Sequence, residues 1–289
     1  MDYSAMIQNR KSFRAFLDTP VTTAALNEIN RYFLNDCKRL IPSIDVEIEI
    51  FKGDVKEQLE GSAGYRDFMI GASCYLVVLS EDAEFCTENA GYLTEDLVLR
   101  MTDLNLSTCW LTFNDGEDVK KALGIKSDKH IAALVAFGYG KKTSKKIRLN
   151  VTNRSKVDIE VRQEYYSPHV GVDNMVSMGK WGNKEGLYDV IGDMESTLWR
   201  GFYAASLAPS YLNRQPYGFV IDKGMVVLVE TCDEYTDPYS EKLNLGIVML
   251  HFVGVVSQML NPVTWVMGPY EHDLGLPEGC RVVASCKVY

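Results

Sequence analysis

The sequence predicts an α+β fold made of two similar halves, and two observations support this prediction. Apolar runs of strand length alternate with segments whose apolar residues recur at helical spacing. The order of these segments then recurs at an offset of roughly 150 residues, which is too long for a solenoid of short repeats and indicates duplicated half-domains. We therefore expect half-domains at residues 1–155 and 156–289 that form an intramolecular pseudo-dimer.

The first half contains five predicted elements. Residues 22–33 begin with a hydroxyl cap and carry apolar side chains at helical spacing, which predicts a helix. Residues 44–51 alternate between apolar and polar side chains, as a half-buried strand does. Continuous apolar runs predict buried strands at residues 74–79 and 131–139, with a helix at residues 94–106 between them.

The second half repeats this order. Its matching segments are residues 227–233 with 77–82, residues 243–258 with 94–106, and residues 264–266 with 109–111. Trp110 and Trp265 thus take equivalent places, and we interpret both as core or interface packing. Polar residues interrupt the long apolar run of residues 243–260, which favours a buried helix over a membrane span.

Composition narrows the classes of function. The chain has 289 residues, of which 46% are apolar, enough for a sizeable core. Its net charge of -9 argues against nonspecific nucleic-acid binding, which needs a broad basic surface. The seven cysteines are odd in number and lack C-x-x-C spacing, and no signal peptide pattern opens the chain, so we expect a cytoplasmic protein with reduced thiols and no membrane partner. The four histidines lack metal-ligand spacing, which makes a metal site unexpected.

A cluster near the start of the chain can bind an anion. We call it the anion grip; its members are Arg10, Lys11, Ser12 and Arg14. Two guanidinium groups, an ammonium group and a hydroxyl group within five residues can neutralise and hydrogen-bond a phosphate. The simpler alternative is an exposed basic helix turn. A second basic run, residues 141–148, is typical of a solvated tail or linker.

A polar turn in the second half can bind a flat heterocycle. Residues 208–217 place Ser210, Asn213 and Gln215 between Pro209 and Pro216, so that hydrogen-bonding groups stand on a stiff turn. The alternative is a turn whose polar side chains satisfy its own backbone. The grip has no copy in the second half, and the turn has none in the first, so we expect one composite site per chain for a nucleotide-like cofactor, with a degenerate second site.

These motifs resemble those of the flavin-dependent nitroreductases, and in particular the fused, double-length members of that family. The resemblance rests on Arg-x-Ser-x-Arg in the grip and on Pro-Ser-x-x-Asn-x-Gln-Pro in the turn, where Tyr217 replaces the usual Trp. Residues 106–113 look like the family's third motif, a helix end of the type Gly-Leu-x-x-x-Trp, although Leu106 and Ser107 stand where a glycine is usual. Residues 138–140, with the basic run that follows them, look like the fourth motif, a Gly-Tyr strand and a basic tail.

The resemblance implies a nitroreductase-like fold, with central, mostly antiparallel sheets flanked by helices, and FMN as the cofactor. The residues implied at the phosphate are Arg10, Lys11, Ser12, Arg14, Lys146 and Arg148. Those implied at the isoalloxazine ring are Pro209, Ser210, Asn213 and Gln215, with the backbone amides near Leu111 and Thr112.

The function that follows is an FMN-dependent oxidoreductase. It takes a hydride from NADH or NADPH and reduces a nitro compound, a quinone or a similar small acceptor by a ping-pong cycle, and no side chain is assigned a catalytic role. The main alternative is a non-catalytic flavin-binding protein for storage, sensing or partner binding; a third is a structural protein without flavin. The expected assembly is a monomer, as a fused pseudo-dimer, or a further homo-oligomer.

Overall fold

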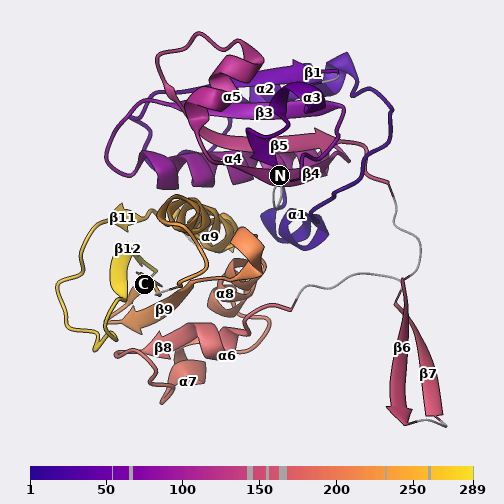
Figure 1. Ribbon diagram of the computed structural model, residues 1–289. Helices are drawn as coiled ribbons and strands as arrows, with labels where there is room; N and C mark the ends of the chain where they lie inside the picture. The colour runs from indigo at the N-terminus through magenta and orange to yellow at the C-terminus, as the bar shows by residue number, and fades with distance from the viewer. Residues whose placement is uncertain are drawn as a thin grey trace.

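The computed structural model describes residues 1–53, 55–64, 68–141, 146–153, 156–162, 168–231, 233–259 and 262–288, with the backbone alone for residues 146–153 and 156–162. These residues form two five-stranded sheets and one two-stranded hairpin. Figure 1 shows the two sheets as separate layers with helices between them.

The first half is an antiparallel sheet with the strand order β1-β3-β5-β4-β2. Its strands are β1 (Val46–Lys52), β2 (Ala63–Gly64), β3 (Cys74–Ser80), β4 (Ser107–Phe113) and β5 (His130–Gly138). Its helices are α1 (Tyr3–Asn9), α2 (Thr23–Asn35), α3 (Lys56–Leu59), α4 (Cys86–Asp103) and α5 (Gly116–Leu123). The predicted helix at residues 94–106 is α4, which begins eight residues earlier than predicted and ends before Asn105, whose φ of 59° is not helical.

The second half has the strand order β11-β12-β10-β9-β8. Its strands are β8 (Val176–Met178), β9 (Tyr217–Asp222), β10 (Met225–Glu230), β11 (Val266–Met267) and β12 (Arg281–Lys287), and only the β8–β9 pair is parallel among these ladders. Its helices are α6 (Val172–Met175), α7 (Leu187–Ile191), α8 (Thr197–Ser206), the 3-10 turn η1 (Tyr211–Asn213) and α9 (Pro238–Met259).

The two halves share one topology. The order β1-β3-β5-β4 in the first sheet corresponds to β9-β10-β12-β11 in the second, and in each half a long helix follows the second of these strands in the chain. Even the irregularities correspond, because the register shifts between Val78 and Leu79 in one central ladder and between Leu228 and Val229 in the other. The predicted fold class, with two half-domains and mostly antiparallel sheets, is confirmed.

Helices α4 and α9 form the main contact between the halves, and α1 also packs against α8 and α9. A Cβ atom on Gly246 would lie 2.0 Å from the carbonyl oxygen of Glu88, and one on Gly91 would lie 2.3 Å from that of Leu243. These contacts are reciprocal, as in the self-complementary interface of a two-fold dimer. Helix α9 is long and apolar enough to cross a membrane, but 72% of its most apolar window is buried inside the protein, so it is the core helix that the sequence predicted.

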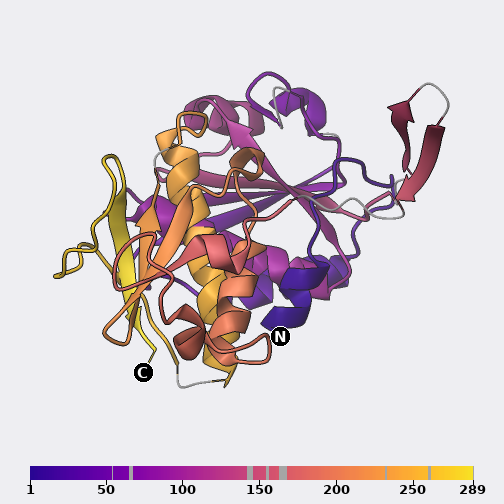
Figure 2. The ribbon, with the colours of Figure 1, turned by 90° about the horizontal axis from the view of Figure 1, so that it is seen from below.

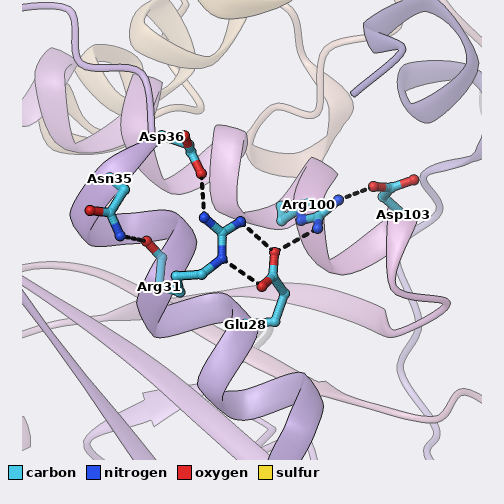
Figure 3. A network of polar contacts seen from close by, with 6 residues as sticks. All are labelled: Glu28, Arg31, Asn35, Asp36, Arg100 and Asp103. Carbon is cyan, nitrogen blue, oxygen red and sulfur yellow. Dashed lines mark hydrogen bonds and ion pairs between the residues drawn. The ribbon is translucent and has the colours of Figure 1, made fainter.

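Polar contacts add to the packing of α2 against α4. Glu28 accepts hydrogen bonds from Arg31 on its own helix and from Arg100 on α4, as Figure 3 shows. These hydrogen bonds lower the pKa of Glu28 to about 2. Exposed ion pairs contribute little to stability, so the buried Ile29 on the same helix matters more for this contact.

A hairpin joins the two halves in sequence. Strands β6 (Lys146–Asn153) and β7 (Lys156–Arg162) pair only with each other among the described ladders, and Figures 1 and 2 show them apart from both sheets. The sequence predicted a solvated tail or linker here; from residue 146 onward the basic run is instead a strand, since it finds a partner in β7. The sequence predicts the boundary between the half-domains after residue 155. Residues 154 and 155 lie outside the described residues, so this boundary stays a prediction.

Candidate functional site

The anion grip lies just after α1, in extended chain, and not in a helix turn. Helix α1 ends at Asn9, and Arg10 is extended, with φ of -61° and ψ of 127°. Ser12 forms a parallel bridge with Thr108, and the backbone N–H of Phe13 donates to the Thr108 oxygen at 2.9 Å. The start of β4 therefore fixes the grip in place.

Arg10 is the buried member of the grip. Its side chain is 10% exposed, and its Nε lies 3.5 Å from Oε1 of Glu95, whose side chain is fully buried. Its Nη1 donates to Ser12 Oγ at 3.5 Å. Nε is buried and has no hydrogen-bond partner among the described residues. By contrast, Lys11, Ser12 and Arg14 are exposed.

Glu95 connects the grip to both halves. Its Oε2 accepts a hydrogen bond from Trp110 Nε1 at 2.9 Å, and its Oε1 lies 3.0 Å from His251 Nε2. His251 Nδ1 lies 3.0 Å from the carbonyl oxygen of Ala204, and only a protonated Nδ1 can donate there. A proton must therefore also lie between Nε2 and Oε1. The buried carboxylate of Glu95, on α4, thus contacts side chains of both β4 and α9.

The positive charge of the grip acts on the pKa of two titratable groups that burial also shifts. Burial raises the pKa of Cys109 to about 11, and the charges of Arg14 and Arg10 oppose this rise. Burial lowers the pKa of His169, and the charge of Arg10 lowers it further. Both guanidinium groups therefore act on Cys109 in β4, and His169, which the sequence did not single out, lies within the field of Arg10.

A cleft separates β4 from the polar turn of the second half. Its lining comes from β4 (Trp110, Leu111, Thr112), from the turn (Pro209, Ser210, Tyr211, Leu212) and from α9 (Ser240, Leu243, Asn244, Ile247). Leu111 and Thr112 therefore face Pro209 and Ser210, as the composite site requires. Trp110 is half-buried and belongs both to this lining and to the Glu95 network, whereas Trp265 is a buried packing residue.

The cleft and the grip lie along the same strand. The grip pairs with Thr108 and the cleft begins at Trp110, so a distance of about 7–10 Å along β4 separates the grip from Leu111 at the usual rise per residue. Leu111 is paired with Leu134 of β5, and Thr112 with Gly64 of β2. Both lie within the sheet, and the role of their backbone amides toward a flavin stays a prediction.

The polar turn has an unusual backbone. Leu212, Asn213 and Gln215 have φ angles of 50°, 58° and 52°, in the left-handed region. This conformation is costly for a bulky side chain such as Leu212, and such costs are concentrated at functional sites. The surrounding structure must therefore hold the turn in this shape.

Asn213 and Gln215 supply that support. Gln215 is buried; its backbone N–H donates to Ser210 Oγ at 2.9 Å, and its Nε2 donates to the Ser206 oxygen at 2.6 Å. Asn213 Nδ2 donates to the Pro168 oxygen at 2.6 Å. The contact between Ser210 and Gln215 corresponds to the alternative in which the turn's side chains satisfy its own backbone, whereas the other two bind the turn to residues outside it. A direct contact of Asn213 or Gln215 with a cofactor stays a prediction.

Lys146 and Arg148 are on β6, and their side chains lie outside the described residues. The backbone of this hairpin stands apart from the grip in both overall views (Figures 1 and 2). The structure therefore brings together the four grip residues, Arg10, Lys11, Ser12 and Arg14. It does not place Lys146 or Arg148 beside them. Their contact with a phosphate stays a prediction.

The donors at this site fit a flavin nucleotide. The grip offers cationic donors for a phosphate, and one buried donor atom of the cleft lining residues, Asn244 Nδ2, has no hydrogen-bond partner in the described part of the chain. The cleft itself is mainly apolar, as the face of an aromatic ring requires. The sequence did not identify Glu95, His251 or Asn244 as site residues. For His251 and Asn244 the available signal was their placement inside the apolar helix α9, whereas Glu95 lies among other polar residues of α4.

Comparisons with known proteins identify the family of this chain and support its fold. The model of the family described as "Putative TM nitroreductase" matches residues 3–255. A putative nitroreductase from Thermotoga maritima MSB8 superposes with a TM-score of 0.59 at 14% identity, over 100% of this chain and 94% of that one. A nitroreductase family protein from Clostridium novyi NT (TM-score 0.44, 19% identity, 49% of this chain and 86% of that one) is also similar.

A third similar structure is an FMN-dependent nitroreductase from Clostridium difficile R20291, with a TM-score of 0.41 and 18% identity over 52% of this chain and 91% of that one. No curated protein sequence matches this chain significantly.

Proposed function

This chain belongs to the nitroreductase family that the matching model describes, and from this premise we propose that it is an FMN-dependent oxidoreductase. It takes a hydride from NADH or NADPH and reduces a nitro compound, a quinone or a similar small acceptor in the cytoplasm. The observation that carries the proposal is the meeting of the first-half grip and the second-half turn on β4, with Arg10 and Trp110 bound to one carboxylate, Glu95.

The grip residues bind the phosphate. Glu95 holds the Nε side of Arg10, which leaves the terminal nitrogens of the guanidinium for the anion, and the exposed Lys11, Ser12 and Arg14 lie beside it. Charge-assisted hydrogen bonds contribute about 1.5–3 kcal/mol each, so a few of them are enough to hold a phosphate firmly. The cluster is local, since the chain as a whole is acidic.

The cleft residues orient the ring and keep water away from one face of it. When bound, FMN supplies the redox chemistry, which needs no nucleophile or general base from the protein. The cleft has a cavity volume of about 80 Å³, which is less than the roughly 300–1,000 Å³ of ordinary ligand pockets. A ring therefore requires the turn and β4 to separate as it binds.

The visible absorption spectrum of the anaerobic protein, before and after addition of NADPH or NADH, tests this function. A flavin spectrum that bleaches supports the oxidoreductase. A protein that stays colourless after incubation with FMN excludes it. The paired substitutions Arg10→Ala and Arg14→Ala should abolish stoichiometric FMN binding, while Arg31→Ala, which removes an exposed arginine of α2, should preserve it. Full retention of FMN by the double variant would refute the role of the grip.

One observation favours the second candidate, a flavin-binding protein without turnover. Tyr217, which replaces the family's usual Trp, is buried, and its hydroxyl lies 3.3 Å from Gln215 Nε2, so it contributes to the support of the turn. Together with the narrow cleft, this arrangement restricts access for a second substrate. A flavin spectrum that persists after addition of both NADH and NADPH would favour this candidate.

A further inference from the structure

Asn89 on α4 and Asn244 on α9 are matched by the internal duplication. Each stands two residues before the close-contact glycine of its helix. Each uses Oδ1 to hold the loop of its own half: Asn89 accepts from Ile41 N at 2.9 Å, and Asn244 accepts from Tyr211 N at 3.1 Å. The relative exposures of Asn89 and Asn244 are 0% and 4%, and neither Nδ2 has a hydrogen-bond partner in the described structure.

The backbone N–H of Tyr211 fixes which way the Asn244 amide points. An N–H donor must face the oxygen of the amide, so Oδ1 faces the turn and Nδ2 takes the opposite position. A buried donor without a partner costs roughly 1–3 kcal/mol. This cost is recovered when an acceptor binds in front of Nδ2.

The surroundings of the two residues differ. Asn244 is part of the cleft lining, together with Leu111, Thr112 and Ser210, whereas Asn89 is not. Only Asn244 thus combines an unpartnered amide nitrogen with a place in the cleft lining, next to the turn that carries the strained Leu212. The same amide thus occurs at matching places in both halves, and only the copy in the second half belongs to a residue that lines a cleft.

We propose that Asn244 is a binding residue of this cleft, which donates a hydrogen bond from Nδ2 to an acceptor atom on the edge of a planar heteroaromatic ring. The inference rests on the proposed function, in which that ring is the isoalloxazine of FMN and the acceptor is a carbonyl oxygen or a ring nitrogen. Because Oδ1 holds Tyr211 at the same time, Asn244 connects the bound ring to the turn.

The experiment compares Asn244→Leu with the matched control Asn89→Leu in the full chain after removal of flavin. Both substitutions remove one loop hydrogen bond and one buried amide, so urea unfolding should show similar losses of stability. FMN affinity, measured by quenching of flavin fluorescence, should fall roughly two- to tenfold for Asn244→Leu and stay unchanged for Asn89→Leu. The midpoint potential of the bound flavin should shift for Asn244→Leu alone, since a hydrogen bond to the ring tunes it.

A second pair, Asn244→Asp and Asn89→Asp, covers the case in which leucine prevents folding. Aspartate keeps an oxygen for the backbone N–H of Tyr211 and removes the donor, so Asn244→Asp should also weaken FMN binding and shift the potential. Equal affinity and potential in the Asn244 and Asn89 variants would overturn the inference while FMN binding by the wild type preserves the proposed function. Failure of the wild type to bind FMN would overturn both.

Discussion

Glu95 on α4 and His251 on α9 meet across the contact between the two halves, with Oε1 and Nε2 3.0 Å apart and both side chains fully buried. The same carboxylate lies against Arg10 of the grip and accepts from Trp110 of the cleft. The proposed cofactor site is therefore connected to the interface between the two halves. A substitution at this interface should also alter the cofactor site.

Replacing Glu95 should destabilise the protein strongly. Glu95→Ala leaves His251 and Arg10 without their carboxylate in a buried place, and breaking such a pair costs about 3–5 kcal/mol. Urea unfolding followed by circular dichroism measures the loss. Glu28→Ala is the control, because Glu28 also pairs with arginines but on the surface (Figure 3), where little change is expected. Similar losses in the two variants would contradict a special role for the buried network.

The sequence predicted the fold well because the strands have clear patterns. The alternation in residues 44–51 became β1, and the apolar runs at residues 74–79 and 131–139 became β3 and β5. The start of α4 was missed, since residues 86–93 include polar side chains that suggest a loop. They are buried because α9 covers them, and a partner on the distant helix α9 leaves no local signal in the sequence.

The site was only partly predictable for the same reason. Leu111 and Ser210 were expected to share one site, and both line the cleft. Gln215 was expected at the cofactor, yet the contacts of its amide support the turn. Glu95 and His251 belong to helices from different halves, and only the packing of α4 on α9 brings them together.

Gly246 should not tolerate a side chain. A Cβ atom there would lie 2.0 Å from the Glu88 carbonyl oxygen, which is backbone and cannot swing aside, so Gly246→Ala must push α9 away from α4. We expect a loss of at least about 1–3 kcal/mol, as for other overpacked cores, and a lower urea midpoint. Gly171→Ala is the control, because nothing lies within 4 Å of its added Cβ. If the two alanine variants unfold at the same midpoint, the close contact of the helices is wrong.

Cys86 should react with alkylating agents at lower pH than an ordinary thiol. It opens α4, lines a cavity of about 720 Å³, and its Sγ lies 3.9 Å from Nε2 of His130. The hydrogen bond to His130 lowers the pKa of Cys86 below its ordinary value of 9.0, while burial raises the pKa of Cys37. Peptide mass spectrometry after iodoacetamide treatment should find Cys86 modified before Cys37 at pH 7.

The variant His130→Gln isolates the cause of that reactivity. Without the imidazole, alkylation of Cys86 should slow at pH 7. At pH 10 it should approach the wild-type rate, because Cys86 is then ionised in both proteins. Equal rates for the two proteins at pH 7 would show that His130 does not activate the thiol. A variant that is slow at both pH values would point to lost access instead.

Stability should fall as pH rises through the range in which Glu241 ionises. Burial, together with the negative charge of Glu230, raises the pKa of Glu241 to about 7, above its ordinary value of 4.5. The folded state therefore binds more protons than the unfolded state between these pH values, so this contribution to stability is present below pH 4.5 and lost by about pH 7. The substitution Glu241→Gln should remove this pH dependence, because the glutamine amide does not ionise.

Urea midpoints measured from pH 4.5 to 8 should coincide for Glu241→Gln and wild type at the acid end and separate as the pH rises, with the variant more stable at pH 8. The exposed Glu185 provides the control, and Glu185→Gln should follow the wild-type curve throughout. Parallel curves for Glu241→Gln and wild type would mean that Glu241 ionises equally easily in the folded and unfolded chain, and that Glu230 does not repel it.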